Sequence, residues 1–489
     1  MQGKCATMRR QTSGRRVALQ SAVIAAASIM LLPSDLVAGQ PQNAAATERA
    51  ETPARTGSGS CAAYGPRAKA LGDTNICVLT SAGVMAYVFK EFTDTDIEMV
   101  GQRIPVPFLD AGLPLAFYHK KDISHETKRV GFGALATADL MLVHMSQAGL
   151  LRGYVRASFD GRSDYDEDGK VRLSLPKIDD SYYYGALNEA WVQFNGLKVG
   201  IQPSLFGFNR VPSILNPTYT SEITTAAASF TIGYARNFTV SISAEDGSRR
   251  NYTEGILSRE FSKSMNPDWV GLVRYATGKS LYHFSAARHE AYDTVVRDFS
   301  GEGNKTPVSG WAVAAGVQTK VAWDEYFGER FKRTPGRLSL TFAAADGAIG
   351  YLGIPFFAPD YVVSSSGEVE RSSGWSAVAA YEHVWAPAWK STLSYSYFSV
   401  EMGSPAEAII PPDIGPLPLD VPVTMMDFDI KVRGSVLQGG IEHKLAPGVT
   451  AGLEVGYTWT EAEGRYGGHK AQELSVGYPH VGFYLRRVF

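Results

Sequence analysis

The chain has 489 residues, of which 45% are hydrophobic, so it is long enough for one large domain or for two or three ordinary ones. It combines 49 Gly, 24 Tyr, 23 Phe and 8 Trp with only 9 His and 3 Cys, a balance that is typical of many short β-strands and unusual for an enzyme of this size. The net charge of −2, without a basic patch, argues against nucleic acid as a partner.

The first 39 residues have the three-part pattern of a cleaved secretory signal. Basic residues precede an apolar run over 22–32, and small residues follow at 37–39. The run has about eleven residues, whereas a membrane-spanning helix needs roughly 18 to 20. We therefore predict a signal peptide over 1–39, with cleavage near 44–46 as the alternative. Its removal takes away five positive charges and Asp35 and changes the net charge from −2 to −6.

Two features are expected directly after the signal. Residues 40–60 are rich in Ala, Thr, Gly and Pro without periodicity, which indicates a flexible leader. Cys61 and Cys77 then close a loop of about 17 residues, and in an oxidising compartment such a pair predicts a disulfide worth about 3 kcal/mol. A metal site would need a nearby His or further Cys, and two buried free thiols are the other alternative.

From about residue 80 onward, apolar and polar residues alternate along the chain. In 451–460 the odd positions are apolar, while the even positions carry Gly, Glu or Thr, as expected for a strand with one oily and one wet face. The same alternation occurs in three further segments: 238–245, 311–320 and 337–342. It is less clean in two others, 185–194 and 374–385, where both faces carry apolar residues.

The aromatic residues separate a membrane barrel from a soluble β-sandwich. They recur near the ends of the predicted strands, as interfacial girdles do: Trp269, Trp311, Trp375, Trp385, Trp389, Tyr457 and Trp459. After the signal there is no apolar stretch of 18 or more residues, so an integral protein must cross the membrane as a closed sheet. The sequence therefore predicts an all-β fold, a transmembrane antiparallel β-barrel.

Chain length sets the number of strands. About 410 residues lie beyond the Cys loop, and a spanning strand uses roughly 9 to 11 of them. Sixteen strands leave about fifteen residues per connection, whereas eight would leave about forty. We predict sixteen strands, with eighteen as the alternative. A barrel of this size leaves an aqueous lumen for small hydrophilic solutes and ions.

Several segments, in order, resemble the alphaproteobacterial, rhizobial-type general porins. They are 60–65, 72–77, 191–200, 244–250, 310–316, 345–351, 374–376, 381–385 and 486–489. The resemblance implies a multi-pass passive diffusion channel over 61–489 in the outer membrane of a Gram-negative bacterium. It further implies a homotrimer, outer-membrane lipid as surroundings and an inward-folded third loop as a constriction. The sequence departs from the family between 83 and 160, where a long polar stretch covers 93–128.

Ion selectivity in such a pore arises from charges at the constriction. If the segment after Pro203 is the inward loop, then 205–225 forms the constriction; otherwise it is an ordinary external loop. The candidates that select ions or shape the bore are four loop residues and two wall residues: Phe208, Arg210, Tyr219 and Glu222 in the loop, and Arg236 and Arg274 on neighbouring strands.

The last strand carries a predicted assembly signal. Val481, Phe483, Leu485 and the terminal Phe489 lie on one face at a period of two, although Arg487 interrupts that face. A terminal aromatic residue on such a strand is what the barrel-assembly machinery is generally taken to read, which makes this machinery a further expected partner.

The sequence contains no strong catalytic or metal-binding motif. Residues 164–169 begin like a calcium loop, but Leu175 stands where a bidentate Glu is required, so a solvated loop with at most weak surface cation binding is expected. His283, His289 and Glu290 lie close in sequence without a nucleophile motif. We therefore expect no enzyme, metal or cofactor. The alternatives are a substrate-selective or mainly structural barrel and, less favoured, a barrel hydrolase.

Overall fold

The computed structural model describes residues 60–64, 68–72, 74–91, 96–106, 109–121, 130–162, 164–165, 171–172, 184–208, 221–235, 237–250, 266–292, 307–321, 336–354, 360–363, 369–402, 428–466 and 469–489. The signal peptide, the leader as far as residue 59, and three of the candidate residues, Arg210, Tyr219 and Arg236, lie outside these ranges.

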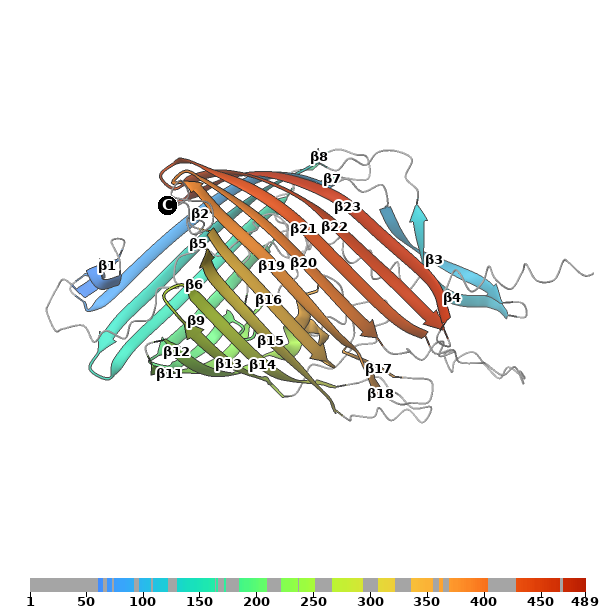
Figure 1. Ribbon diagram of the computed structural model, residues 1–489, viewed down its shortest axis with the longest axis horizontal. Coiled ribbons are helices and arrows are strands. Elements are labelled where there is room, and N and C mark those ends of the chain that lie inside the picture. The colour runs from blue at the N-terminus through green and yellow to red at the C-terminus, as the bar shows by residue number, and fades with distance from the viewer. Residues whose placement is uncertain are drawn as a thin grey trace, which may run out of the picture.

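Sixteen antiparallel strands close into a barrel, as predicted (Figure 1). They are β2 (Ile76–Glu91), β5 (Val130–Ser146), β6 (Gly149–Arg162), β9 (Tyr184–Phe194), β10 (Leu197–Pro203), β11 (Thr224–Ala235), β12 (Phe238–Glu245), β13 (Asp268–Ala276), β14 (Ser280–Tyr292), β15 (Pro307–Val321), β16 (Gly336–Asp346), β19 (Ser373–Ala386), β20 (Trp389–Met402), β21 (Phe428–Ala446), β22 (Val449–Tyr466) and β23 (His469–Val488). Each pairs with its neighbours in chain order, and the pairing of β2 with β23 closes the sheet. The structure thus decides between sixteen and eighteen strands in favour of sixteen.

The remaining elements add no further staves to the barrel. β1 (Lys69–Ala70) pairs with β2, and three separate pairs are formed by β3 (Asp96–Val106) with β4 (Leu109–Lys121), β7 (Asp164–Tyr165) with β8 (Val171–Arg172), and β17 (Tyr361–Val363) with β18 (Val369–Arg371). The 3-10 turns are η1 (Ser60–Tyr64), η2 (Gly247–Arg249) and η4 (Ile349–Leu352). No helix in the described ranges has both the length and the apolar character needed to cross a membrane.

The two ends of the barrel differ in their connections. Five hairpins at one end are joined by two residues each, and Asn195, which opens the turn after β9, has a φ of 50°. Asn tolerates this left-handed conformation better than most residues, and Asn-Gly favours the tight turn that a hairpin needs. We call this the turn end and the opposite end the loop end. The third, fourth and sixth loop-end connections are named L3 (204–223), L4 (246–267) and L6 (347–372).

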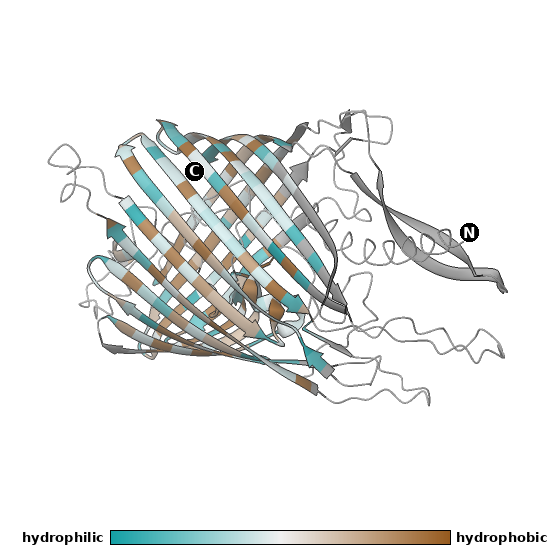
Figure 2. Cartoon of the chain, turned by 45° about the vertical axis from the view of Figure 1, so that its right-hand side comes forward, coloured by the Kyte–Doolittle hydropathy of each residue, from teal (hydrophilic) through white to brown (hydrophobic). Residues whose placement is uncertain are grey.

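Side chains alternate between the two faces of the barrel wall, as Figure 2 shows in bands of brown and teal along the strands. Phe230, Ile232 and Ile242 are exposed on the outside, while Ser241 and Ser243 are buried on the inside. In a membrane the exposed apolar face lies against lipid, which is favourable because the backbone is fully paired within the closed sheet.

The exposed aromatic side chains of the outer face are unevenly distributed. All exposed Trp and Tyr among the described residues lie on β13 to β22: Trp269, Tyr275, Tyr282, Trp311, Trp375, Trp385, Trp389, Tyr395 and Tyr457. On β2 to β12, the exposed large hydrophobic residues are Val, Leu, Ile, Met and Phe. Among the side chains that the structure describes, the exposed Trp and Tyr thus follow half of the circumference, while Phe is the exposed aromatic residue of the other half.

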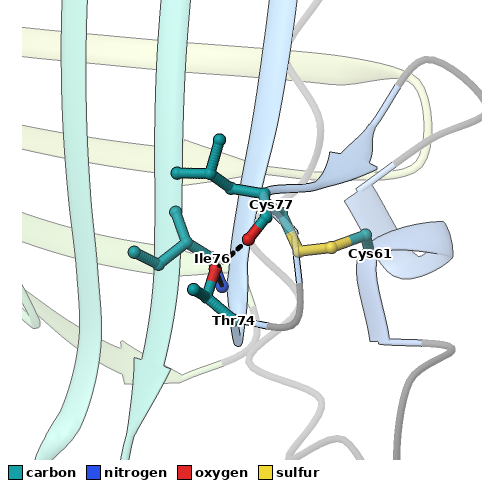
Figure 3. The surroundings of a disulfide bond; sticks show 5 residues. Cys61, Thr74, Ile76 and Cys77 are labelled. Carbon is teal, nitrogen blue, oxygen red and sulfur yellow. Dashed lines mark hydrogen bonds between the residues drawn. A yellow bond between two sulfur atoms is a disulfide. The ribbon is translucent and has the colours of Figure 1, made fainter.

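The disulfide predicted from the sequence is present. Cys61 in η1 is bonded to Cys77 near the start of β2, with 5.4 Å between the two Cα atoms (Figure 3). The bridge is buried beside Val143 of β5, and the Ile76 amide donates to Thr74 Oγ1 next to it. The segment before the first barrel strand is thus fastened to the turn end of the wall.

Candidate functional site: the barrel interior

L3 turns into the barrel directly after β10. Phe206 and Phe208 are 0% and 3% exposed although they belong to a connection between strands. The Ser204 amide donates to the Ile223 carbonyl at 2.9 Å, which joins the two limbs of the loop where they leave Pro203 and Thr224. The predicted segment 205–225 therefore needs a small correction, since its last two residues already pair within β11.

The first limb of L3 lies against the inner face of three strands. Ser285 Oγ of β14 donates to the Phe206 carbonyl at 2.8 Å, and Thr341 Oγ1 of β16 donates to the Phe208 carbonyl at 3.1 Å. The Phe208 ring lies 5.0 Å from the His283 ring, centroid to centroid. The described first limb of L3, residues 204–208, thus lies against the inner wall, as an inward-folded loop would begin.

Two glycines make this close packing possible. A Cβ atom at Gly316 on β15 would collide with the Phe208 ring, and one at Gly207 would collide with the backbone of Glu222. The first glycine gives the ring a place on the wall, and the second lets the two described limbs of L3 run side by side.

A buried carboxylate holds the base of L3. Glu245 at the end of β12 is 2% exposed, and its Oε1 accepts from the Leu205 amide at 2.9 Å and from Ser243 Oγ at 2.7 Å. Hydrogen bonds to an ionised acceptor are about twice as strong as neutral ones, so this contact fixes the point at which L3 enters the barrel.

L6 contributes a second inward segment. The turn η4 and its neighbours are buried among inner-wall residues of β13 to β16, β20 and β21, in an apolar cluster shared with Phe206. Its members from L6 are Ala348, Ile349, Tyr351, Leu352 and Ile354. The sequence singled out 345–351 for its resemblance alone, and nothing in its composition indicated an interior position.

A buried polar network lies beside η4. Asp268 Oδ2 accepts from Tyr351 Oη at 2.7 Å, and the Asp268 carboxylate lies 2.8 Å from His289 Nδ1. On the other side of the imidazole, His289 Nε2 lies 3.3 Å from Asp360 Oδ2, while Asp360 Oδ1 accepts from the Ile349 amide at 2.6 Å. In the part of the chain that the structure describes, no group of His, Cys, Asp and Glu is arranged to hold a metal ion.

The inner wall of β5, β6 and β9 is charged. Arg156 Nε lies 2.6 Å from Asp139 Oδ1, and Arg156 Nη1 lies 3.4 Å from Glu189 Oε1. Trp191 Nε1 donates to Glu189 Oε2 at 3.2 Å, and the Lys198 ammonium lies 4.1 Å from the centre of the Trp191 ring. This side of the interior carries ion pairs, whereas the side occupied by L3 and L6 combines an apolar cluster with a buried polar network.

A ladder of alternating charges follows the inner wall near the turn end. Lys390 Nζ lies 3.4 Å from Glu382 and 2.9 Å from Glu442. Arg337 lies 3.9 Å from Glu382 at one end of the ladder, and Arg486 lies 3.8 Å from Glu442 at the other. No single motif predicts the ladder, because its members come from five different strands.

The remaining candidate residues fall at defined places. Glu222 lies on the second limb of L3, and Arg274 lies on the inner face of β13 with its Nε 3.3 Å from His283 Nδ1. Phe489 is 55% exposed, its amide donates to the Ala82 carbonyl, and the Arg487 guanidinium lies over its ring at 4.7 Å. Glu222 thus lies on the loop and Arg274 on the wall, where His283 beside it contacts the first limb of L3.

His283 and His289 make structural contacts, and neither is oriented to activate a nucleophile. His283 Nε2 lies 3.2 Å from Ser285 Oγ, but Arg274 faces Nδ1 and can only donate. Nδ1 must therefore accept, and Nε2 carries the proton toward the Phe206 carbonyl at 3.1 Å. A catalytic His needs the opposite tautomer, with an acid at Nδ1 and a free lone pair toward the Ser.

Comparison with known proteins agrees with this architecture. A family model described as a porin subfamily matches residues 126–476. The outer membrane channel DcaP of Acinetobacter baumannii is similar in fold, with a TM-score of 0.53, 13% identity and coverage of 85% of this chain and 98% of that one. Pseudomonas putida OprB has a TM-score of 0.43, 11% identity and coverage of 84% and 94%, respectively. No curated protein matches. Since the family model spans most of the barrel, the chain belongs to the porin subfamily and is a multi-pass channel protein of the Gram-negative outer membrane.

Proposed function

We propose that the barrel is a passive diffusion channel for small hydrophilic solutes and ions, of the alphaproteobacterial, rhizobial type, with L3 as its constriction. The observation that carries this proposal is the inward course of L3, whose Phe206 and Phe208 pack on the inner wall. A barrel of sixteen strands has an aqueous lumen, and a loop that lies inside it narrows the path. Charged side chains at the narrowing act strongly on passing ions.

Within this proposal, the candidate residues have distinct roles. Phe208 shapes the bore through its place on the wall, Glu222 supplies a negative charge from the second limb of L3, and Arg274 supplies a positive charge from β13. Arg210 and Tyr219 of L3, and Arg236 after β11, keep the roles expected from the sequence.

We also propose that three copies of the chain associate through the outer face of β2 to β12. Trp and Tyr are enriched where a protein surface meets the lipid–water interface. The exposed Trp and Tyr of the described outer face are confined to β13 to β22, which supports protein rather than lipid as the neighbour of the other half. Chemical cross-linking of the detergent-solubilised protein tests this, and a monomer without larger species contradicts it.

The alternative of a hydrolase has little support. The tautomer that Arg274 imposes on His283 leaves that His unable to take a proton from Ser285. We therefore expect no hydrolysis of ester, lipid or peptide substrates by the purified protein. Hydrolysis that disappears on His283→Ala substitution would support the enzyme instead.

Conductance across a planar lipid bilayer tests the leading proposal. The refolded full chain is expected to give ohmic steps of porin size, with a current that rises in proportion to salt and is not blocked by one particular solute. Saturable block by a single sugar or anion indicates a substrate-selective channel. The absence of any steps from correctly folded protein would contradict channel function and favour a structural barrel.

A further inference from the structure

The inward segment of L6 and the constriction loop L3 form one unit. The Phe206 ring of L3 meets the Tyr351 ring of L6 edge to face, with 4.7 Å between the centroids. Both rings are fully buried, so no water separates the two loops at this point. A displacement of either segment would expose apolar surface of the other, which couples their positions.

Arg250, which directly follows η2 in L4, connects these two loops. Its Nη2 donates to Ser204 Oγ of L3 at 2.8 Å, and its Nη1 donates to the Gly350 carbonyl of L6 at 3.2 Å. The guanidinium also lies 3.8 Å from the centre of the Tyr351 ring. Arg250 is only 2% exposed, so one buried cation contacts L3 and L6 at the same time.

The backbone and side-chain atoms around Arg250 pack closely against it. A Cβ atom at Gly350 would collide with the Arg250 carbonyl, so the L6 backbone touches the L4 backbone there. Arg250 Nη1 lies 3.3 Å from the Ser221 carbonyl, which brings in the second limb of L3 as well. The planar guanidinium, with five fixed donors, can serve several acceptors at once, which a Lys ammonium does less well.

The inner wall beneath L3 and L6 carries small side chains that leave room for the two loops. The residues of β14 to β16 that belong to the apolar cluster with L3 and L6 are all alanines: Ala287, Ala312, Ala314, Ala343 and Ala345. Small side chains leave room inside the barrel for L3 and L6, and their apolar surface favours a dry contact. The network of Asp268, His289 and Asp360 then fastens η4 to β13 and β14.

We propose that Arg250 is a positioning residue of the channel, and that 347–354 of L6 is a second constriction element which Arg250 holds together with L3. The proposal rests on the proposed function of L3 as the constriction. Removing the guanidinium leaves the Ser204 hydroxyl and the Gly350 carbonyl without their buried donor, and a lost hydrogen bond to a charged group is expensive. The loops then leave the wall more often, and the open channel fluctuates more.

Thiol labelling combined with conductance tests the inference on the full chain. Ala348 lies next to η4 and is 1% exposed. Cys61 and Cys77 are in the disulfide, so with Cys5 replaced by Ser, Ala348→Cys provides a single reactive thiol. In this background, Arg250→Gln is expected to speed labelling by a charged methanethiosulfonate by about tenfold or more. Arg250→Lys restores part of the protection. Arg288→Gln, which removes an Arg from β14 with its side chain 66% exposed, is the matched control and changes nothing.

The outcomes separate the inference from the function on which it rests. Labelling that stays as slow in Arg250→Gln as in Arg288→Gln overturns the positioning role, whatever the conductance does. If no variant conducts, the channel proposal fails, while the labelling still decides whether Arg250 holds L6. If Arg250→Gln does not fold, as judged by heat-modifiable migration in gels, Tyr351→Phe replaces it, because that change removes only the hydroxyl bonded to Asp268.

Discussion

Replacing Phe206 by Ala is expected to free the constriction without unfolding the barrel. The ring is fully buried, and truncating a buried Phe to Ala costs about 3 to 5 kcal/mol. The backbone bonds that attach L3 to Ser285 and Thr341 contribute about 1 kcal/mol each, and the bond from Leu205 to the Glu245 carboxylate about 1.5 to 3 kcal/mol. The ring thus contributes about as much to the attachment of L3 as these three bonds together.

This loss raises the fraction of time that L3 is detached by roughly two to three orders of magnitude. Single-channel recording at constant voltage is expected to show frequent excursions to higher conductance. The barrel itself keeps its strand pairing, so circular dichroism and heat-modifiable migration stay unchanged. Phe230→Ala, on the outer face of β11, is the control and leaves the current steady. A folded Phe206→Ala protein with wild-type current noise would refute the reasoning.

Four further outcomes are expected. Replacing both Cys61 and Cys77 by Ser removes about 3 kcal/mol of stabilisation from the N-terminal segment, which limited proteolysis detects as faster cleavage there. Deleting Phe489 lowers the amount of barrel in isolated outer membranes, measured by immunoblot, while total synthesis is unchanged. Lys390→Gln leaves Glu382 and Glu442 without the cation between them, so the zero-current potential in a salt gradient shifts toward cation preference. Burial raises the pKa of Tyr351 well above its usual value of about 10, so its bond to Asp268 persists at pH 10. The labelling rate of Ala348→Cys, divided by that of a Cys on the outer face at the same pH, is therefore constant up to about pH 10.

The fold could be predicted because alternation is a local signal. In 451–460 the apolar or polar character of each residue indicates the face of the strand on which it lies. In the structure, β22 shows the corresponding alternation of exposed and buried side chains. The segment 311–320 was predicted as a strand on the same grounds, but its inner positions, Ala312 and Ala314, are apolar too. They pack against inward loops instead of water. A pattern of period two cannot distinguish a wall that faces a lumen from a wall that faces an interior loop.

The site could be predicted only in part, because its contacts join distant segments. The family resemblance pointed to the segment after Pro203, and its described first limb has Phe208 on the inner wall, while its role as the constriction stays a prediction. Arg250 and Gly350 are 100 residues apart, and neither carries a local signal for the other. His289 was considered only as a catalytic candidate, since proximity in sequence to His283 suggested chemistry, whereas its partners Asp268 and Asp360 come from other segments.

The charge ladder near the turn end bears on where selectivity arises. Every cation in it lies within 4 Å of a carboxylate: Arg337 and Lys390 contact Glu382, and Arg486 and Lys390 contact Glu442. With three cations and two carboxylates, the ladder keeps one net positive charge, while its paired charges neutralise one another within about the Debye length of 8 Å at physiological salt. The ladder thus joins the five strands that supply its members. In the proposed channel, discrimination between anions and cations is expected at the level of L3, whose base is held by Arg250 and Phe206.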